Sequence, residues 1–184
     1  MSLKKYLLWT LTFVYVTTGA SADTGPKTVQ KVDLNRYAGM WHEAARMPNP
    51  FEDKAAEKIT AQYSLNRDGT IQVENRCMVK GKWQKVTGVA RVADRSTNAK
   101  LEVSFFSILG LRPVWGDYWI IGLSEDYTCS VVGDRNRKYA WILSRTPQLN
   151  ETDKAKALAA LKDNGYDINK LIYPNRSETL HNNQ

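Results

Sequence analysis

The sequence predicts an all-β fold: an eight-stranded antiparallel up-and-down barrel with one C-terminal helix packed outside. Three observations support this prediction. Apolar and polar residues alternate with a period of two in eight short segments, turn residues separate these segments, and only one segment has helical spacing. Eight strands joined by hairpin-length turns also fit a two-sheet sandwich, so the pattern alone leaves that architecture open.

The predicted strands follow one another at short intervals. In the second, apolar Ile59, Ala61 and Tyr63 alternate with polar neighbours. The Asp68-Gly69 step after it is typical of a tight turn, because glycine tolerates positive φ. The expected strands cover residues 39–46, 58–65, 71–79, 84–92, 99–105, 117–123, 127–133 and 139–145.

One helix is expected after the strands. Asn150 is a suitable N-cap, and the acidic residues Glu151 and Asp153 favour the positive end of the helix dipole. Gly165 can adopt the left-handed backbone conformation that ends a helix after its last turn. The apolar stripe that would face the barrel is narrow: Ala157, Leu158 and Leu161.

Residues 1–22 have the organisation of a secretory signal peptide. Lys4 and Lys5 precede an apolar run over residues 7–16, and Ala20-Ser21-Ala22 is the small-residue pattern of a cleavage site. We therefore expect an exported chain with no membrane span, because no apolar run reaches the roughly 18 residues that a span needs. The expected parts are the signal peptide 1–22, a polar leader 23–31, the barrel with its helix 32–174 and a polar tail 175–184.

Composition excludes several classes of protein. A length of 184 residues with 42% hydrophobic and 24% charged residues fits a single globular domain. Two cysteines exclude a disulfide scaffold and a four-thiolate zinc site, and two histidines leave little for histidine catalysis. No metal site and no cofactor are predicted.

The formal net charge of +7 would permit nucleic acid or anionic lipid as a partner. A groove that tracks a nucleic acid strand needs a basic stripe interleaved with aromatic residues, and none is visible, so no nucleic acid is expected. The same charge would hold the protein near an anionic membrane surface. The basic residues do not form a stripe but are scattered over outward strand positions and turns: Lys58, Lys85, Lys100, Arg95, Arg135, Arg137 and Lys138.

Three segments carry a resemblance to a known family. The stretch from Asp33 to Glu43 (DLNRYAGMWHE) resembles the first signature of the lipocalins, a short helix followed by G-x-W at the start of the first strand. The segments 116–119 (GDYW) and 141–147 (WILSRTP) are similar to the second and third signatures, and 46–52 (RMPNPFE) resembles the bacterial, apolipoprotein D-like branch. Two departures are His42, where the family usually has Tyr, and the absence of a lipid-attachment Cys near the cleavage site.

The resemblance implies a barrel closed at one end and a bound lipid. The signal peptide and the absence of a lipid-attachment Cys lead us to expect a soluble periplasmic protein, without a lipid anchor to the outer membrane. The first strand starts, and the eighth ends, at the closed end, so the Arg145 guanidinium should lie over the Trp41 indole there, a contact worth roughly 0.5–2 kcal/mol. Gly39, Trp41 and Arg145 are therefore predicted to form a structural base without chemistry. Asp33 is expected to cap the short helix that plugs this end.

Small inward residues among aromatic ones predict a cup that binds a ligand, although a filled barrel would show the same alternation. Tyr hydroxyls, Asn75 and Glu43 would hold the head of an amphiphile, expected from the resemblance to be a fatty acid or lysophospholipid needed for membrane maintenance. The predicted lining residues are Ala61, Tyr63, Val73, Asn75, Cys77, Gly88, Ala90, Leu101, Val103, Phe105, Tyr118, Ile120, Tyr139 and Trp141.

Catalysis is not expected. His42 and Glu43 are adjacent and would point to opposite faces of a strand, so they cannot form a dyad. The alternative is a lipocalin-form enzyme that acts on a bound lipid or peroxide through Cys77, for which no histidine of matching parity is visible. Cys77 and Cys129 lie about 10 Å apart in predicted height, beyond the roughly 7 Å that a disulfide spans, so we predict two free thiols.

Hairpin counting places three connections at the open end of the cup: residues 46–56, 79–82 and 106–115. The last is unusually apolar for a loop. It would fold over the mouth as a lid, dip into a membrane surface, or pair with a second copy, so a monomer and a homodimer both remain open. We predict that it controls ligand access and contacts lipid, with Lys80 and Lys82 nearby, through Ile108, Leu109, Leu111, Arg112 and Trp115.

Overall fold

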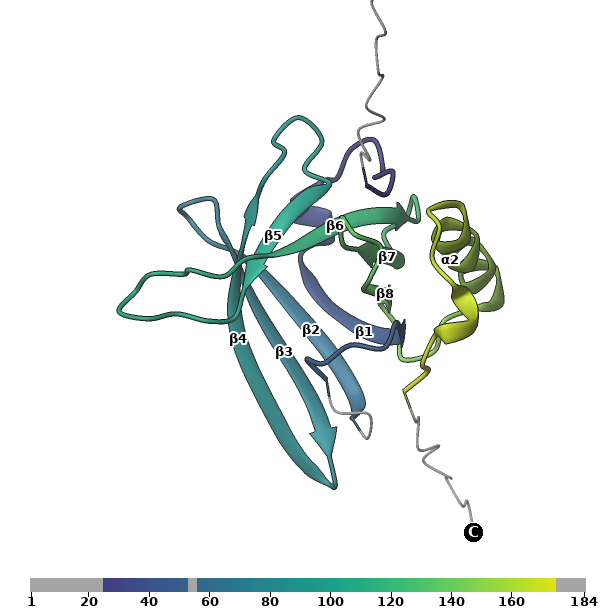
Figure 1. Ribbon diagram of the computed structural model, residues 1–184, viewed down its shortest axis with the longest axis horizontal. Coiled ribbons are helices and arrows are strands. Elements are labelled where there is room, and N and C mark those ends of the chain that lie inside the picture. Colours follow the sequence, from purple (N-terminus) through teal and green to yellow (C-terminus); the bar gives the residue numbers. More distant parts are fainter. Residues whose placement is uncertain (1–24, 53–55, 175–184) are drawn as a thin grey trace, which may run out of the picture.

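The protein forms a closed antiparallel barrel in which the eight strands follow one another in sequence order (Figure 1). This computed structural model describes residues 25–52 and 56–174, so the predicted signal peptide and polar tail lie outside the described residues. The strands are β1 (Gly39–Arg46), β2 (Glu57–Leu65), β3 (Ile71–Val79), β4 (Lys82–Val92), β5 (Lys100–Ser104), β6 (Gly116–Leu123), β7 (Cys129–Gly133) and β8 (Ala140–Ser144).

Pairing of the first and last strands decides between the two architectures that the sequence left open. β1 pairs with β2 on one side and with β8 on the other, which closes the sheet into a barrel and excludes a sandwich. The alternation predicted the starts of all eight strands to within two residues. β7 begins at Cys129 instead of residue 127, since Tyr127 and Thr128 belong to the turn that Asp126 and Ser124 hold by hydrogen bonds.

The helices form where their capping residues indicate. Asp33 accepts hydrogen bonds from the backbone of Asn35 and Arg36 and caps α1 (Leu34–Tyr37). Asn150 caps α2 (Glu151–Asp163), which packs on the outside of the barrel against β6 and β7, and the short helix η1 (Ile168–Lys170) follows (Figure 1).

Both chain segments that flank the barrel are tied to it. In the leader, the Val29 amide donates to Ile120 and the Val32 amide donates to Thr97, so this polar segment crosses the closed end with Val32 fully buried. Near the C-terminus, Arg46 and Ile172 exchange two backbone hydrogen bonds of 2.9 and 2.8 Å at the other end of β1.

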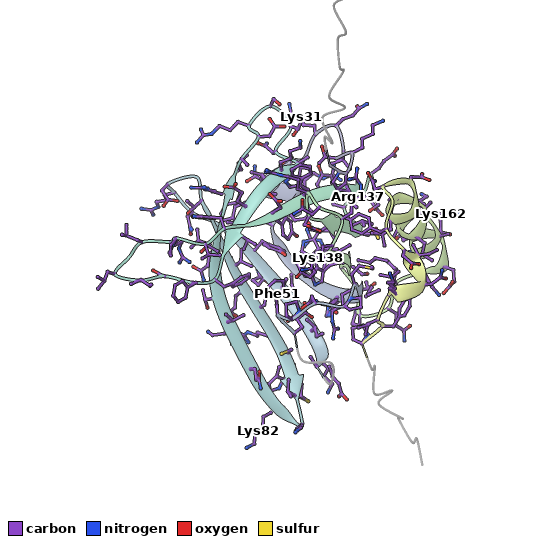
Figure 2. The ribbon with its side chains drawn as sticks, viewed as in Figure 1. Lys31, Phe51, Lys82, Arg137, Lys138 and Lys162 are labelled. Atoms are coloured by element: carbon purple, nitrogen blue, oxygen red, sulfur yellow. The ribbon has the colours of Figure 1, made fainter. Side chains whose placement is uncertain are left out.

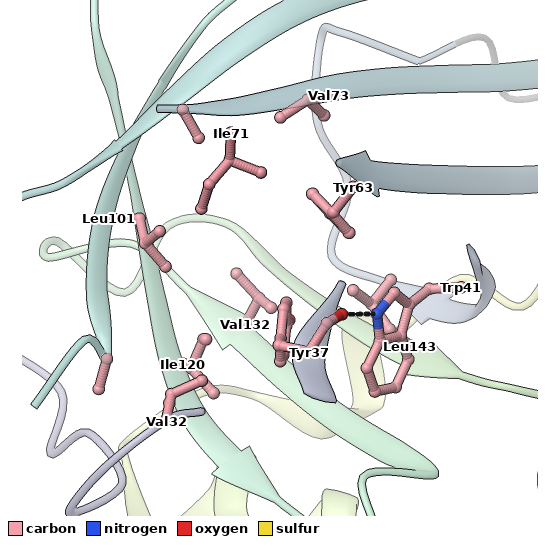
Figure 3. Close-up of a cluster of buried hydrophobic side chains, with 12 residues drawn as sticks. Val32, Tyr37, Trp41, Tyr63, Ile71, Val73, Leu101, Ile120, Val132 and Leu143 are labelled. Carbon is pink, nitrogen blue, oxygen red and sulfur yellow. Dashed lines mark hydrogen bonds between the residues drawn. The ribbon is translucent and has the colours of Figure 1, made fainter. Parts of the chain in front are cut away.

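The closed end is sealed by one arginine and one tryptophan, as the sequence indicated. The Arg145 guanidinium lies 3.8 Å from the Trp41 ring centroid and donates to the carbonyls of Arg36, Ala38 and Met40. The Trp41 indole nitrogen donates to the Tyr37 carbonyl, and both side chains belong to the apolar cluster that fills the base (Figure 3).

Gly39 adopts a φ of +97°, in the region that favours glycine, and a Cβ there would lie 3.2 Å from Arg145. Glycine is therefore required at this position both by the backbone conformation and by the close approach of the guanidinium.

A second apolar cluster lies outside the barrel wall, between the sheet and α2, and includes Ile121, Val131, Ala157 and Leu161. In the described part of the chain, Cys77 and Cys129 are not joined by a disulfide. None of the described helices is long and apolar enough to cross a membrane.

Candidate ligand-binding cavity

The barrel encloses a cavity of about 860 Å³ that reaches from the base to the open end. Its size falls within the range of pockets that hold one small molecule. The predicted residues that line it are Ala61, Tyr63, Val73, Asn75, Cys77, Ala90, Leu101, Val103, Phe105, Tyr118, Tyr139 and Trp141.

Two predicted lining residues do not face this space. Gly88 points inward, but the Phe105 ring covers it: a Cβ on Gly88 would lie 2.6 Å from that ring. Gly88 therefore makes room for Phe105. Ile120 is fully buried in the apolar cluster of the base, where the backbone of Val29 crosses it.

The floor of the cavity is a chain of hydroxyls. Tyr118 donates to Tyr63 at 3.0 Å and lies 2.8 Å from the Tyr37 hydroxyl, which in turn lies 3.0 Å from Ser130. Burial raises the pKa of Tyr37 to about 12 and that of Tyr63 further, so these hydroxyls stay neutral. Higher up the wall, the Asn75 Oδ1 atom is buried and has no hydrogen-bond partner in the described part of the chain.

A charged cluster lies on the β1 side of the cavity. Arg46, whose side chain is 2% exposed, donates to Glu43 Oε1 at 2.7 Å, and its Nε lies 3.4 Å from Glu52 Oε2. Glu52 Oε1 also accepts from the Trp141 indole nitrogen at 2.8 Å. Burial, together with the neighbouring Glu52 carboxylate, raises the pKa of Glu43 to about 8. At neutral pH the Glu43 carboxyl therefore holds a proton.

A β-bulge brings this cluster together. Glu43 and Arg46 are three residues apart and would point to opposite faces of a regular strand. The register with β8 shifts between Glu43 and Ala45, which inserts one residue and turns Arg46 to the side of Glu43. Sequence reasoning found Glu43 but missed Arg46 and Glu52, although the segment 46–52 that contains both had been singled out.

The loop of residues 105–115 does not cover the mouth, so the lid interpretation is wrong. It extends away from the ring of strands (Figure 1), and Leu109 at its tip is 98% exposed. Ile108 and Leu111 pair across a tight turn in which Leu109 and Gly110 both have positive φ. Such a two-residue turn directs its central side chains outward.

Arg112 and Trp115 stabilise the loop where it joins β5 and β6. Arg112 donates to the Ser104 carbonyl at 2.9 Å, and the Arg112 carbonyl accepts from the Trp115 indole. The Arg91 guanidinium in turn lies over the Trp115 ring, 4.1 Å from its centroid. The Arg112 guanidinium, predicted to contact lipid, thus uses one of its donors within the loop itself.

Four connections surround the mouth, one more than predicted, because the β7–β8 turn contributes Asp134 and Asn136 to the lining. No histidine is among the lining residues that the structure describes, although Cys77 is. Among those residues there is also no group of three or more His, Cys, Asp or Glu side chains arranged to hold a metal.

A closed eight-stranded barrel with an apolar cup and a floor of tyrosines is the architecture of proteins that hold one small hydrophobic molecule. Comparison with known proteins agrees: the family description "Lipocalin-like domain" matches residues 32–176, and the chain belongs to the lipocalin family. Lipocalins bind small hydrophobic molecules, and most of them are binding or transport proteins.

Relatives come from plants, bacteria and animals. The chain is 38% identical to temperature-induced lipocalin-1 of Arabidopsis thaliana, over 83% of this chain and 84% of that protein. It is 37% identical to the outer membrane lipoprotein Blc of Escherichia coli K12 (88% and 91%) and 33% identical to apolipoprotein D of Rattus norvegicus (90% and 90%). The solved structure of insecticyanin from Manduca sexta shares the fold, with a TM-score of 0.68 at 24% identity over 83% of this chain and 85% of that one.

Proposed function

We propose that the protein binds and carries a single-chain amphiphilic lipid, a fatty acid or lysophospholipid, with its acyl chain in the cavity. The observation that carries this proposal is a largely apolar cup of about 860 Å³ with tyrosine hydroxyls at its floor, Asn75 on its wall and a charged cluster on its β1 side. About ten buried CH₂ groups at about 0.8 kcal/mol each correspond to a micromolar Kd before ordering costs are subtracted.

The rim supports a role at membranes. The tip of the β5–β6 loop exposes Ile108, Leu109 and Leu111, and the β3–β4 hairpin carries Lys80 and Lys82 at its own tip (Figure 2). Apolar side chains that enter a bilayer beside lysines that attract anionic head groups are the elements of peripheral membrane binding. In this proposal the protein is exported and collects lipid from a membrane surface for membrane maintenance.

Native mass spectrometry of the protein purified from its own host tests the proposal. A retained lipid of one chain, at one copy per protein, is the expected result. Purified protein that holds no lipid and displaces no hydrophobic fluorophore when fatty acid or lysophospholipid is added would contradict it. Because Cys77 lines the cavity, turnover of a bound lipid or peroxide that disappears in Cys77→Ser while ligand binding persists would favour an enzyme instead.

A further inference from the structure

The aromatic side chains beside the charged cluster form a continuous group at the mouth of the cavity. Phe51 and Tyr139 meet edge to face with ring centroids 5.2 Å apart, and Tyr139 and Trp141 lie 6.4 Å apart. All three rings line the cavity, as do Glu43 and Glu52. Tyr139 already has an ammonium over its face, because Lys138 Nζ lies 5.1 Å from the ring centroid (Figure 2).

Two carboxyl groups, Glu43 and Glu52, lie beside one guanidinium, that of Arg46, so the charges balance only while one carboxyl group is protonated. Glu52 Oε2 is buried and accepts no hydrogen bond from an N–H or hydroxyl group of the described residues. Arg46 Nε lies 3.4 Å away, and the protonated Glu43 carboxyl is the neighbour that can donate to Glu52. Asp134, the other carboxylate of this part of the lining, is satisfied by the backbone amides of Asn136, Lys138 and Tyr139.

We propose that Glu43, Glu52 and the rings of Phe51, Tyr139 and Trp141 form a subsite for a positively charged amine head group carried on the bound chain. This inference rests on the proposed function and names the head group of its ligand. Aromatic faces together with carboxylates recognise quaternary and primary ammonium groups, since the rings attract cations and the carboxylates supply the charge. A free fatty acid, in contrast, would bring a carboxylate beside two others.

A proton and the cationic head group compete for the same negative charge at this subsite. Burial and the neighbouring Glu52 carboxylate raise the pKa of Glu43 to about 8, so Glu43 keeps a proton at neutral pH and the surplus negative charge is avoided. An ammonium group that arrives beside Glu52 removes the need for the proton. Binding of the cationic amphiphile therefore releases a proton at pH 7, and its affinity rises between pH 7 and pH 9.

Titration calorimetry with matched probes, all below their micellar concentrations, tests the subsite. Dodecyltrimethylammonium is expected to bind about tenfold more tightly than dodecanol, as a cation–π contact with a partly desolvated carboxylate allows. The heat should depend on the ionisation enthalpy of the buffer, as proton release requires. Lysophosphatidylcholine that binds more tightly than lysophosphatidic acid of equal chain length points to a zwitterionic lysolipid as the natural source, and a preference confined to dodecyltrimethylammonium points to a simple amine.

Glu52→Gln is the decisive variant, because Gln keeps an acceptor for the Trp141 indole and removes the charge. It is expected to bring the preference for dodecyltrimethylammonium within about twofold, while dodecanol binds as before. Tyr139→Leu should weaken the same preference, and Glu102→Gln, on the outer face of β5, should leave it unchanged. A preference that survives Glu52→Gln, or its absence in the wild type, overturns the subsite. Failure of every probe to bind overturns the proposed function itself.

Discussion

The closed and open ends of this barrel treat buried polar groups in opposite ways. At the closed end, the Arg145 guanidinium covers Trp41 and donates hydrogen bonds to backbone carbonyls, which replace the water it has lost. At the open end, Glu52 and Asn75 keep buried oxygens that accept no hydrogen bond from an N–H or hydroxyl group of the described residues. An unmet buried acceptor costs about 1–3 kcal/mol. The hydrogen bonds at the base are satisfied within the protein and favour stability, whereas the cavity retains acceptors that a ligand could satisfy.

The largest expected effect lies at the base. Trp41→Ala should lower the free energy of unfolding by about 3–5 kcal/mol, since Trp41 is completely buried and supports Arg145. Trp83→Ala is the matched control, because that ring is 60% exposed on β4, and its effect should stay within about 0.5 kcal/mol. Urea unfolding followed by circular dichroism measures both. Equal losses would show that the base is no more important for stability than the outer surface.

The next effect is a pH dependence that belongs to the open end. The pKa of Glu43 is raised from 4.5 to about 8, so between these values the folded chain holds a proton that the unfolded chain has released. The stability from this group is therefore complete below pH 4.5 and is lost as the pH rises through 8, by roughly 2–4 kcal/mol. Urea titrations from pH 5 to 9 should show this decline in wild type and in Glu102→Gln. In Glu43→Gln the decline should be smaller, and an unchanged slope would contradict the proton held by Glu43.

A smaller change in stability, but a clear change in lipid transfer, is expected at the β5–β6 loop. Leu109→Asn combined with Leu111→Ser should alter the free energy of unfolding by less than about 0.5 kcal/mol, because both side chains are exposed and Asn tolerates the positive φ of residue 109. Uptake of fluorescent fatty acid from anionic vesicles should slow several-fold. Met40→Ser, at an exposed position of the closed end, serves as the control. Normal uptake by the loop variant would show that the loop does not contact lipid.

The smallest effect concerns the thiols. Titration in denaturant without reductant should find two thiols per chain, Cys77 and Cys129. In the folded protein Cys129 should react much more slowly than it does in denaturant, since burial raises its thiol pKa to about 12 and the thiolate is the reactive form. A count of zero in monomeric protein would mean that the two cysteines are bridged.

Period-two alternation was sufficient to predict most of the barrel and most of the cavity wall, because each regular strand exposes every second residue to the interior. Tyr63, Val73 and Val103 follow this rule directly. It fails where a side chain from another strand intervenes. Gly88 has the right parity, but only the fold brings Phe105 over it.

The charged cluster shows a second limit of local patterns. Arg46 changes face because of the bulge after Glu43, and Glu52 reaches the cavity from a loop, where no periodicity applies. The lid was one of three interpretations that the apolar composition of the β5–β6 loop left open. The Leu109-Gly110 turn, which projects the tip away from the mouth, depends on a backbone conformation that leucine rarely adopts and that composition does not reveal.

The exchange of hydrogen bonds between Arg46 and Ile172 fixes the C-terminal segment at the open end, whereas the leader crosses the closed end at Val29 and Val32. The described chain does not begin at the closed end, however, because Gly25 lies against Trp119 and the Arg135 carbonyl of the β7–β8 turn at the mouth. A fluorophore placed at the exposed position of Tyr173, next to the contact between Ile172 and β1, would lie close to the mouth and report on ligand loading.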